Sequence, residues 1–83
     1  MTRVTKVIPL DDYILYLEFS DGKKGVFDVK PYLNMTVFME LRDKDYFCRA
    51  RVAFGTIVWP NEQDIAPETL YVELIESDKY DAA

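Results

Sequence analysis

The sequence contains no histidine, a single cysteine and only three glycines, which stand apart from one another. Without histidine, the chain lacks the commonest general base, the commonest metal ligand and any histidine-based catalytic triad. The isolated glycines exclude a glycine-rich phosphate loop. A zinc site would need carboxylates almost alone, which is unusual. These absences predict that the protein is not an enzyme and has no metal site and no cofactor.

Long apolar runs are missing as well. No stretch approaches the roughly 20 residues that span a bilayer, and the start of the chain lacks the apolar stretch and cleavage site of a secretory signal. Cys48 has no second cysteine to pair with, and we expect it to be buried in a protein kept in a reducing compartment. The sequence therefore predicts a cytoplasmic protein with no membrane partner.

What the chain does have is material for one small core, together with an excess of acid. It has 83 residues, of which 49% are hydrophobic and 14% aromatic, and this predicts a single domain over residues 1–83. The net charge of −5 argues against direct binding to nucleic acid, because phosphate binding relies on Lys and Arg. The best basic cluster, between Arg42 and Arg51, is interrupted by Asp43 and Asp45, so we expect a mixed, solvated surface there.

The first half of the chain carries the patterns of β-strands. Residues 3–8 are rich in β-branched side chains, and we expect Pro9 to end this strand at the margin of a sheet. Residues 13–19 alternate with a period of two, with apolar side chains on both faces, so both faces should be partly covered. The pair Asp21-Gly22 predicts a tight hairpin turn before a return strand over residues 24–29.

The middle of the chain changes character. Residues 35–47 place apolar side chains at helical spacing, which predicts one or two short helical turns with Asp43 as a cap. Residues 48–54 alternate again, and this predicts a strand whose inward side chains are those of Cys48, Ala50, Val52 and Phe54. Gly55 then supports a tight turn into a partner strand over residues 56–59.

The stretch WPNEQDIAPETLY, residues 59–71, holds the densest set of unusual residues. Asn61 tolerates left-handed turn geometry, and Pro67 fits the first turn of a helix. Since Ala66 is a poor cap, we expect the Asp64 carboxylate to supply the missing acceptor at the helix start. All of these patterns together predict an α+β fold, in which antiparallel hairpins form a small sheet, short helical turns lie in the middle and a helix ends the chain.

Several motifs match a known pattern in the same order along the chain. They are PLDDY at residues 9–13, FDVxPYL at residues 27–33 and GTIVWPNxxDIAPExLY at residues 55–71. The chain thereby resembles a family of small bacterial proteins catalogued as domain of unknown function 2442. The family usually has glycine where Glu62 stands, which puts the geometry of that turn in question. The resemblance implies an α+β domain with a C-terminal helix and brings no catalytic assignment.

The resemblance also implies a kind of partner. Members of the family occur alone or ahead of a helix-turn-helix DNA-binding domain, and we expect this chain to be the stand-alone form. They are also found beside a second family of small proteins, in gene pairs that look like toxin–antitoxin pairs. A homodimer is allowed too, through the edge strand over residues 3–8, although Lys6 and Pro9 would discourage edge pairing.

Two functions from different classes follow. The preferred one is a protein-interaction module, the acidic, antitoxin-like partner of a small basic protein encoded in the adjacent gene. The alternative is a sensor domain that binds a small ligand or a divalent ion near Trp59, Asn61 and Asp64. We take Trp59, Asn61, Asp64 and Tyr71 as candidate ligand- or partner-binding residues, while turn and capping roles explain the first three more simply.

Overall fold

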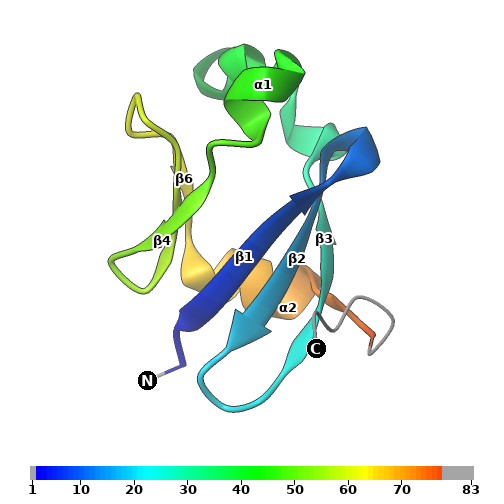
Figure 1. Ribbon diagram of the computed structural model, residues 1–83, viewed down its shortest axis with the longest axis vertical. Coiled ribbons are helices and arrows are strands. Elements are labelled where there is room, and N and C mark those ends of the chain that lie inside the picture. Colours follow the sequence, from blue (N-terminus) through cyan, green and yellow to red (C-terminus); the bar gives the residue numbers. More distant parts are fainter. Residues whose placement is uncertain (1, 78–83) are drawn as a thin grey trace.

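The structure is a computed structural model that describes residues 2–77. Its secondary structure elements, in chain order, are β1 (Val4–Leu10), η1 (Asp11–Tyr13), β2 (Ile14–Phe19), β3 (Lys24–Asp28), η2 (Lys30–Tyr32), η3 (Thr36–Arg42), α1 (Lys44–Phe47), β4 (Arg51–Ala53), β5 (Thr56–Val58), β6 (Asp64–Ile65), α2 (Pro67–Glu73) and β7 (Ile75–Glu76). The strands form a four-stranded antiparallel sheet, β1-β2-β3-β7, and a three-stranded antiparallel sheet, β4-β5-β6. The predicted α+β fold is therefore confirmed (Figure 1).

The β2–β3 hairpin turns where the sequence predicts. Gly22 has a φ of 95°, which glycine adopts without a steric penalty. The turn is closed by two backbone hydrogen bonds, from Phe19 N to Lys23 O at 2.8 Å and from Gly22 N to Phe19 O at 3.0 Å. The return strand buries Phe27, and Val29 just beyond its end is buried too, as expected.

The first strand is longer than predicted. β1 continues through Pro9 to Leu10, and Pro9 stands opposite Leu15 in the register with β2. The prediction that Pro9 ends the strand is wrong because β1 is an edge strand of its sheet. A proline on an edge needs no amide hydrogen for a second neighbour, so the ladder with β2 survives it.

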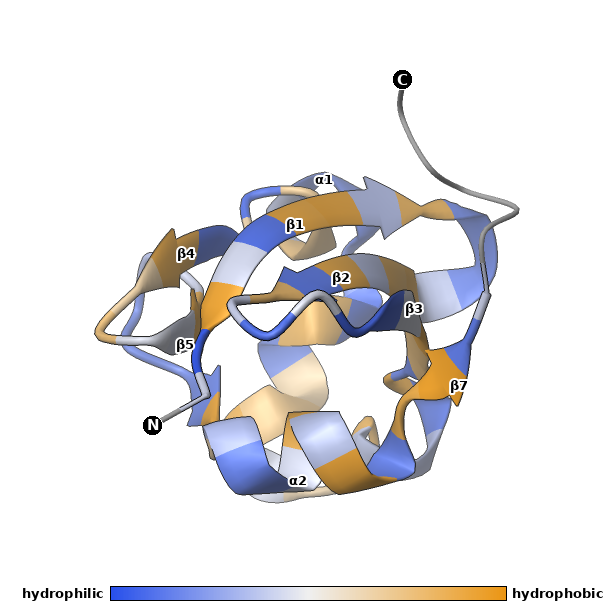
Figure 2. Cartoon of the chain, turned by 90° about the horizontal axis from the view of Figure 1, so that it is seen from below, coloured by the Kyte–Doolittle hydropathy of each residue, from blue (hydrophilic) through white to orange (hydrophobic). Residues whose placement is uncertain are grey.

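Helix α2 covers one face of the larger sheet, and the core lies between them (Figures 1 and 2). Leu15, Leu17 and Phe27 of the sheet belong to the same buried cluster as Leu70 of α2. Tyr16 points to the other side of β2 and is equally buried, which confirms that both faces of this strand are covered. The buried cluster also includes residues of the second sheet, so one continuous core unites the two sheets.

The β4–β5 hairpin differs from the prediction. β4 contains only three residues, and the turn is formed by Phe54 and Gly55, whose φ angles are 55° and 78°. Positive φ at both central residues is typical of a type I′ turn. Phe54 is thus a turn residue with an exposed side chain, and Val52 is exposed as well. The prediction that both point inward is wrong, because the hairpin turns one residue earlier than the alternation implied.

The predicted helical turns are confirmed as η3 and α1, which lie together at one end of the molecule (Figure 1). Asp43 caps α1 as predicted, and its Oδ1 accepts a hydrogen bond from Asp45 N at 3.0 Å. Cys48 ends α1, because its N–H bonds to Lys44 O, and its side chain is exposed. The prediction of a buried Cys48 on a strand is therefore wrong. Over residues 2–77, no helix has the length and apolar character needed to cross a bilayer.

Gly25 of β3 lies close against the backbone of β7. A Cβ at this position would lie 2.1 Å from the carbonyl oxygen of Ile75 in β7. We expect Gly25→Ala to force β7 off the sheet edge and to lower the free energy of unfolding by about 1–3 kcal/mol. Urea denaturation measures the loss. Hydrogen exchange should show that the amide of Ser77, which bonds to Lys24 O, loses its protection.

Gly22→Ala is the control for this substitution. A Cβ at Gly22 meets nothing within 4 Å, so only the positive φ is penalised, by about 1 kcal/mol. This variant should keep the protection of the Ser77 amide. Equal protection of that amide in both variants would contradict the close approach as the reason for glycine at position 25.

Candidate functional site

The stretch over residues 59–65 forms a tight connection between β5 and β6. Trp59 N donates to Gln63 O and Glu62 N donates to Trp59 O, each at 2.9 Å. Pro60 follows the last paired residues of β5, as its missing N–H requires. These bonds fix the backbone from which the side chains of Trp59, Asn61 and Asp64 project.

The side chain of Trp59 is part of the core, with a relative exposure of 1%. Its Nε1–H donates to the carbonyl oxygen of Phe47 at 2.9 Å, and its ring packs on the Phe47 ring with centroids 6.1 Å apart. The indole therefore anchors the end of β5 to the C-terminal end of α1. A tryptophan buried in this way satisfies its only donor inside the protein.

The side chain of Asn61 is held by a carboxylate from a distant part of the chain. Its Nδ2 donates to both oxygens of Glu40, at 2.8 and 2.9 Å, and Nε2 of the buried Gln63 donates to Glu40 Oε1 at 2.9 Å. Tyr46 completes the network, because its Oη accepts from Asn61 N at 2.8 Å and donates to Gln63 Oε1 at 2.6 Å. The network ties the β5–β6 connection to η3 and α1.

The network also sets the protonation of Glu40. The hydrogen bonds from Asn61 and, to a smaller extent, Gln63 lower the pKa of its carboxyl below the ordinary value. Hydrogen bonds donated to a carboxylate favour its charged form. Glu40 is therefore an anion that organises the loop.

The left-handed residue of this turn is Glu62, whose φ is 72°. Asn61 tolerates left-handed geometry but does not adopt it here, since its φ is not positive. Asn61 is held instead by its contacts with Tyr46 and Glu40. A glutamate in the left-handed region carries a steric cost that glycine would avoid.

Asp64 does not cap α2. It lies on β6 opposite Val58, and the N-terminus of α2 at Ala66 has no side-chain cap hydrogen bond, so the predicted capping role is wrong. Pro67 is the first residue of the helix, as predicted, and its ring removes one of the donors that a cap would satisfy. Within residues 2–77, the Asp64 carboxylate has no hydrogen bond or ion pair.

A groove of about 150 Å³ lies beside Asp64. Its lining, which we call the hairpin groove, consists of Arg51, Phe54, Val58, Trp59, Pro60, Glu62 and Asp64. Trp59 and Asp64 thus share one surface, and Asn61 is next to it in sequence but is turned toward Glu40. The alternative sensor function would use this groove.

Tyr71 lies on a different surface, on α2 against the β2–β3 hairpin. Its Oη donates to Asp21 Oδ2 at 2.7 Å, and its ring meets Phe19 edge to face at 5.1 Å. Lys23 Nζ stands 4.0 Å from the ring centroid and donates to Tyr71 O at 2.8 Å. Because of the hydrogen bond between them, the pKa of the Asp21 carboxyl is lowered and that of the Tyr71 hydroxyl is raised.

Tyr71 also borders an open, mostly apolar hollow of about 250 Å³ on the outer side of α2. We call this surface the helix hollow; it is lined by Thr2, Pro67, Glu68, Tyr71 and Val72. Val72 at its rim has a relative exposure of 79%. The candidate residues from the sequence are therefore divided between two surfaces, the hairpin groove and the helix hollow.

Residues 4–76 match the family described as a protein of unknown function, DUF2442. The chain belongs to the DUF2442 family. No curated protein and no solved structure matches the chain. The DUF2442 match spans both sheets and α2, so it confirms the resemblance that the motifs indicate. The position where the DUF2442 resemblance implies glycine is Glu62, the left-handed residue of the β5–β6 turn.

Glu40, Tyr46 and Gln63 belong to this site, and sequence reasoning missed all three. Gln63 stands inside the conspicuous stretch, but its burial follows from a partner 23 residues away in the sequence. In the sequence pattern, Tyr46 is one of the apolar residues of a predicted short helix. No spacing rule links either to Glu40, because the contacts are long-range.

The carboxyl groups and the metal-ligating residue types can be compared with what catalysis requires. The resolved pKa shifts of carboxyl groups, at Glu40 and Asp21, are both downward, whereas a general acid needs an upward shift. Within residues 2–77, no group of three or more acidic or cysteine side chains is placed to hold a metal ion.

The Glu40 network predicts a specific pH dependence of stability. Because the folded-state pKa of Glu40 is depressed, its contribution is fully present above the ordinary value of 4.5 and is lost as the pH falls through the lowered pKa. Glu40→Gln removes the negative charge and replaces the second acceptor oxygen, Oε2, with an NH2 group that faces the Asn61 donor, so it should be less stable than the wild type at neutral pH. The difference should shrink in acid.

Urea denaturation at a series of pH values measures this difference. Asp64→Asn is the control, since Asp64 makes no hydrogen bond in the part of the chain that the structure describes, and it should follow the wild type closely. The difference in unfolding free energy between wild type and Glu40→Gln could instead stay constant down to strong acid. That result would show that the charged form of the Glu40 carboxylate does not hold the loop.

Proposed function

We propose that the protein is a protein-interaction module in the cytoplasm that docks a basic segment of a small partner protein, encoded in the adjacent gene, on the outer side of α2. It acts by binding and not as an enzyme. The helix hollow is the docking surface. The exposed free thiol of Cys48 supports a reducing compartment.

One observation carries this proposal: Val72 is largely exposed at the rim of an apolar hollow on a helix whose charged residues are all acidic. Ile75, the first residue of β7, is 63% exposed. Exposed apolar side chains beside an apolar hollow gain free energy when a partner covers them. They are therefore the anchor points expected of an interface.

The charge around the hollow favours a basic partner. Residues 52–77 contain five acidic residues and neither Lys nor Arg. Glu68 lines the hollow itself. An acidic surface repels acidic competitors, and it speeds the encounter with a basic partner. An acidic, antitoxin-like role beside a small basic protein is consistent with this distribution.

The sensor function at the hairpin groove has weaker support. Asp64 and Glu62 offer two exposed carboxylates there, and Trp59 contributes to the lining. Yet the indole N–H is bonded to Phe47 and the Asn61 side chain to Glu40, so of the three residues named for this function only Asp64 has a side chain without a hydrogen bond within residues 2–77. The helix hollow is the larger and more apolar of the two surfaces.

Affinity isolation from the native host tests the proposal. At low salt, the tagged chain should recover one small basic protein. Val72→Ser removes the apolar anchor and Glu68→Lys reverses the charge, and each should weaken the purified complex about tenfold or more, equivalent to about 1.4 kcal/mol. Titration calorimetry measures the affinity.

Val37→Ser is the matched control, because Val37 is also an exposed valine, with a relative exposure of 58%, and lies on η3. It should bind the partner as the wild type does. A partner that is acidic, or one whose affinity is unchanged by both substitutions in α2, would contradict the docking surface.

A further inference from the structure

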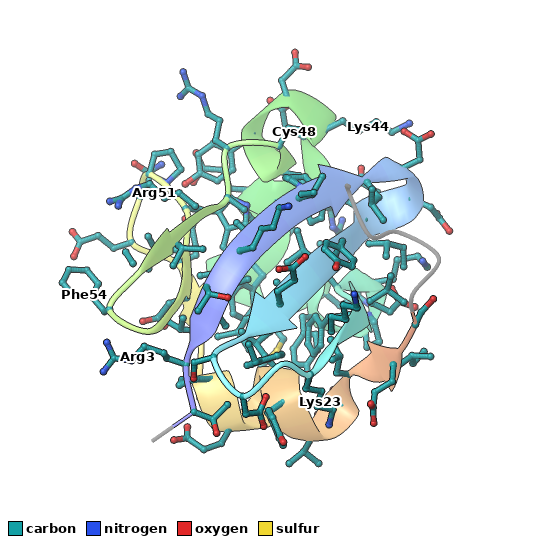
Figure 3. The ribbon with its side chains drawn as sticks, turned by 60° about the horizontal axis from the view of Figure 1, so that its bottom comes forward. Arg3, Lys23, Lys44, Cys48, Arg51 and Phe54 are labelled. Atoms are coloured by element: carbon teal, nitrogen blue, oxygen red, sulfur yellow. The ribbon has the colours of Figure 1, made fainter. Side chains whose placement is uncertain are left out.

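Phe54 is the most exposed large hydrophobic side chain in the described part of the chain. It stands at the tip of the β4–β5 hairpin with a relative exposure of 93%. Figure 3 shows it projecting away from the body of the molecule. Folding therefore gains almost nothing from its ring.

The backbone of Phe54 adds a cost to that exposure. Its φ of 55° is a left-handed conformation, which costs a side chain with a Cβ roughly 1–2 kcal/mol. Asn or Gly would fit the same type I′ turn without this penalty and without exposing an aromatic ring. Asp12, Tyr13 and Glu62 also have positive φ, so it is the combination with an exposed aromatic ring that distinguishes Phe54.

Two arginines lie on either side of the ring in Figure 3. Arg51 belongs to β4, and Arg3 directly precedes β1. Arg3 is close to the turn, because its Cβ would lie 3.4 Å from a Cβ added to Gly55. Within residues 2–77, neither arginine forms an ion pair. We call Arg3, Arg51 and Phe54 the basic knob. Glu62 and Asp64 line the hairpin groove beside Arg51 and Phe54, and within residues 2–77 neither forms an ion pair with Arg51.

The helix hollow complements the basic knob in shape and in charge. Its volume is about 250 Å³, and apolar cavities of about 150 Å³ already bind benzene. Glu68 at its lining is opposite in sign to Arg3 and Arg51. A phenyl ring flanked by guanidinium groups therefore matches an apolar hollow bordered by a carboxylate.

The knob and the hollow also lie next to each other. Thr2 lines the hollow, and the next residue, Arg3, belongs to the knob. Val4 N then bonds to Gly55 O at 2.9 Å, which fixes the start of the chain against the hairpin turn. In Figure 1, the hairpin tip and the start of α2 lie on the same lower side of the molecule.

We propose that the helix hollow accepts Phe54 of a second copy of this chain. The knob and the hollow of one copy are neighbours. A two-fold axis between two copies can therefore place the knob of each copy in the hollow of the other, which closes the assembly as a dimer. The acidic surface of α2 would repel the same surface of another copy, so the basic knob is its complement within this sequence. The dimer and the partner of the proposed function would compete for the hollow.

Sedimentation velocity of the purified protein tests this inference without any partner. The wild type should reversibly dimerise. Phe54→Ser and Val72→Asp should each raise the dimer dissociation constant at least tenfold, because the first removes the knob and the second closes the hollow to an apolar ring. Both side chains are exposed, so circular dichroism should show an unchanged fold.

A mixture of the two variants gives the decisive result. Phe54→Ser retains its hollow and Val72→Asp retains its knob, so one of the two contacts can form between them. The mixture should associate more tightly than either variant alone and less tightly than the wild type. Val37→Asp, on η3, should dimerise as the wild type does.

Four results would overturn the inference: a monomeric wild type, a Phe54→Ser or Val72→Asp variant that dimerises normally, a mixture no tighter than its components, or a Val37→Asp variant that no longer dimerises. None of them bears on the proposed function, because a basic partner can dock on a monomer. Conversely, loss of partner binding without loss of dimerisation would leave this inference standing.

Discussion

The hydrogen bond from the Trp59 indole to the Phe47 carbonyl is the contact on which the rest of the structure depends. It joins the end of β5 to the end of α1, two segments that the sequence separates by a strand and a turn. The Phe47 ring packs against Trp59 on one side and meets Tyr13 edge to face at 5.3 Å, so the same aromatic cluster reaches the larger sheet. A small domain has few such buried aromatic groups, and each therefore carries a large share of the burial that stabilises it.

This anchor determines which residues remain for function. With Trp59 in the core and Asn61 bonded to Glu40, the conspicuous stretch at residues 59–65 is mainly scaffolding. Surfaces that folding does not use lie elsewhere, at the helix hollow and at Phe54. They differ in charge, since the hollow is bordered by acid and Phe54 by arginine. Two such surfaces support the proposed interaction module.

Local patterns predicted much of this fold. Asp21-Gly22 set the first hairpin, Asp43 capped α1 and Pro67 began α2, because each feature depends on a few neighbouring residues. Alternation failed at residues 48–54, where a helix end and a turn placed one residue earlier left Cys48 and Phe54 exposed. The strand itself is only three residues long, Arg51–Ala53, so alternation has little length over which to act. The Glu40–Asn61 contact could not be predicted at all, since it depends on how distant segments pack.

Hydrogen exchange of the Trp59 indole N–H, followed by NMR, tests the central claim most directly. If this bond holds the two segments together, the indole proton should exchange only through global unfolding, as slowly as the best protected amides of β2. Exchange as fast as that of amides in the exposed turn at Phe54 would contradict the account. The stretch at residues 59–65 would then be a loop that opens independently of the core, and its side chains would be available to a ligand.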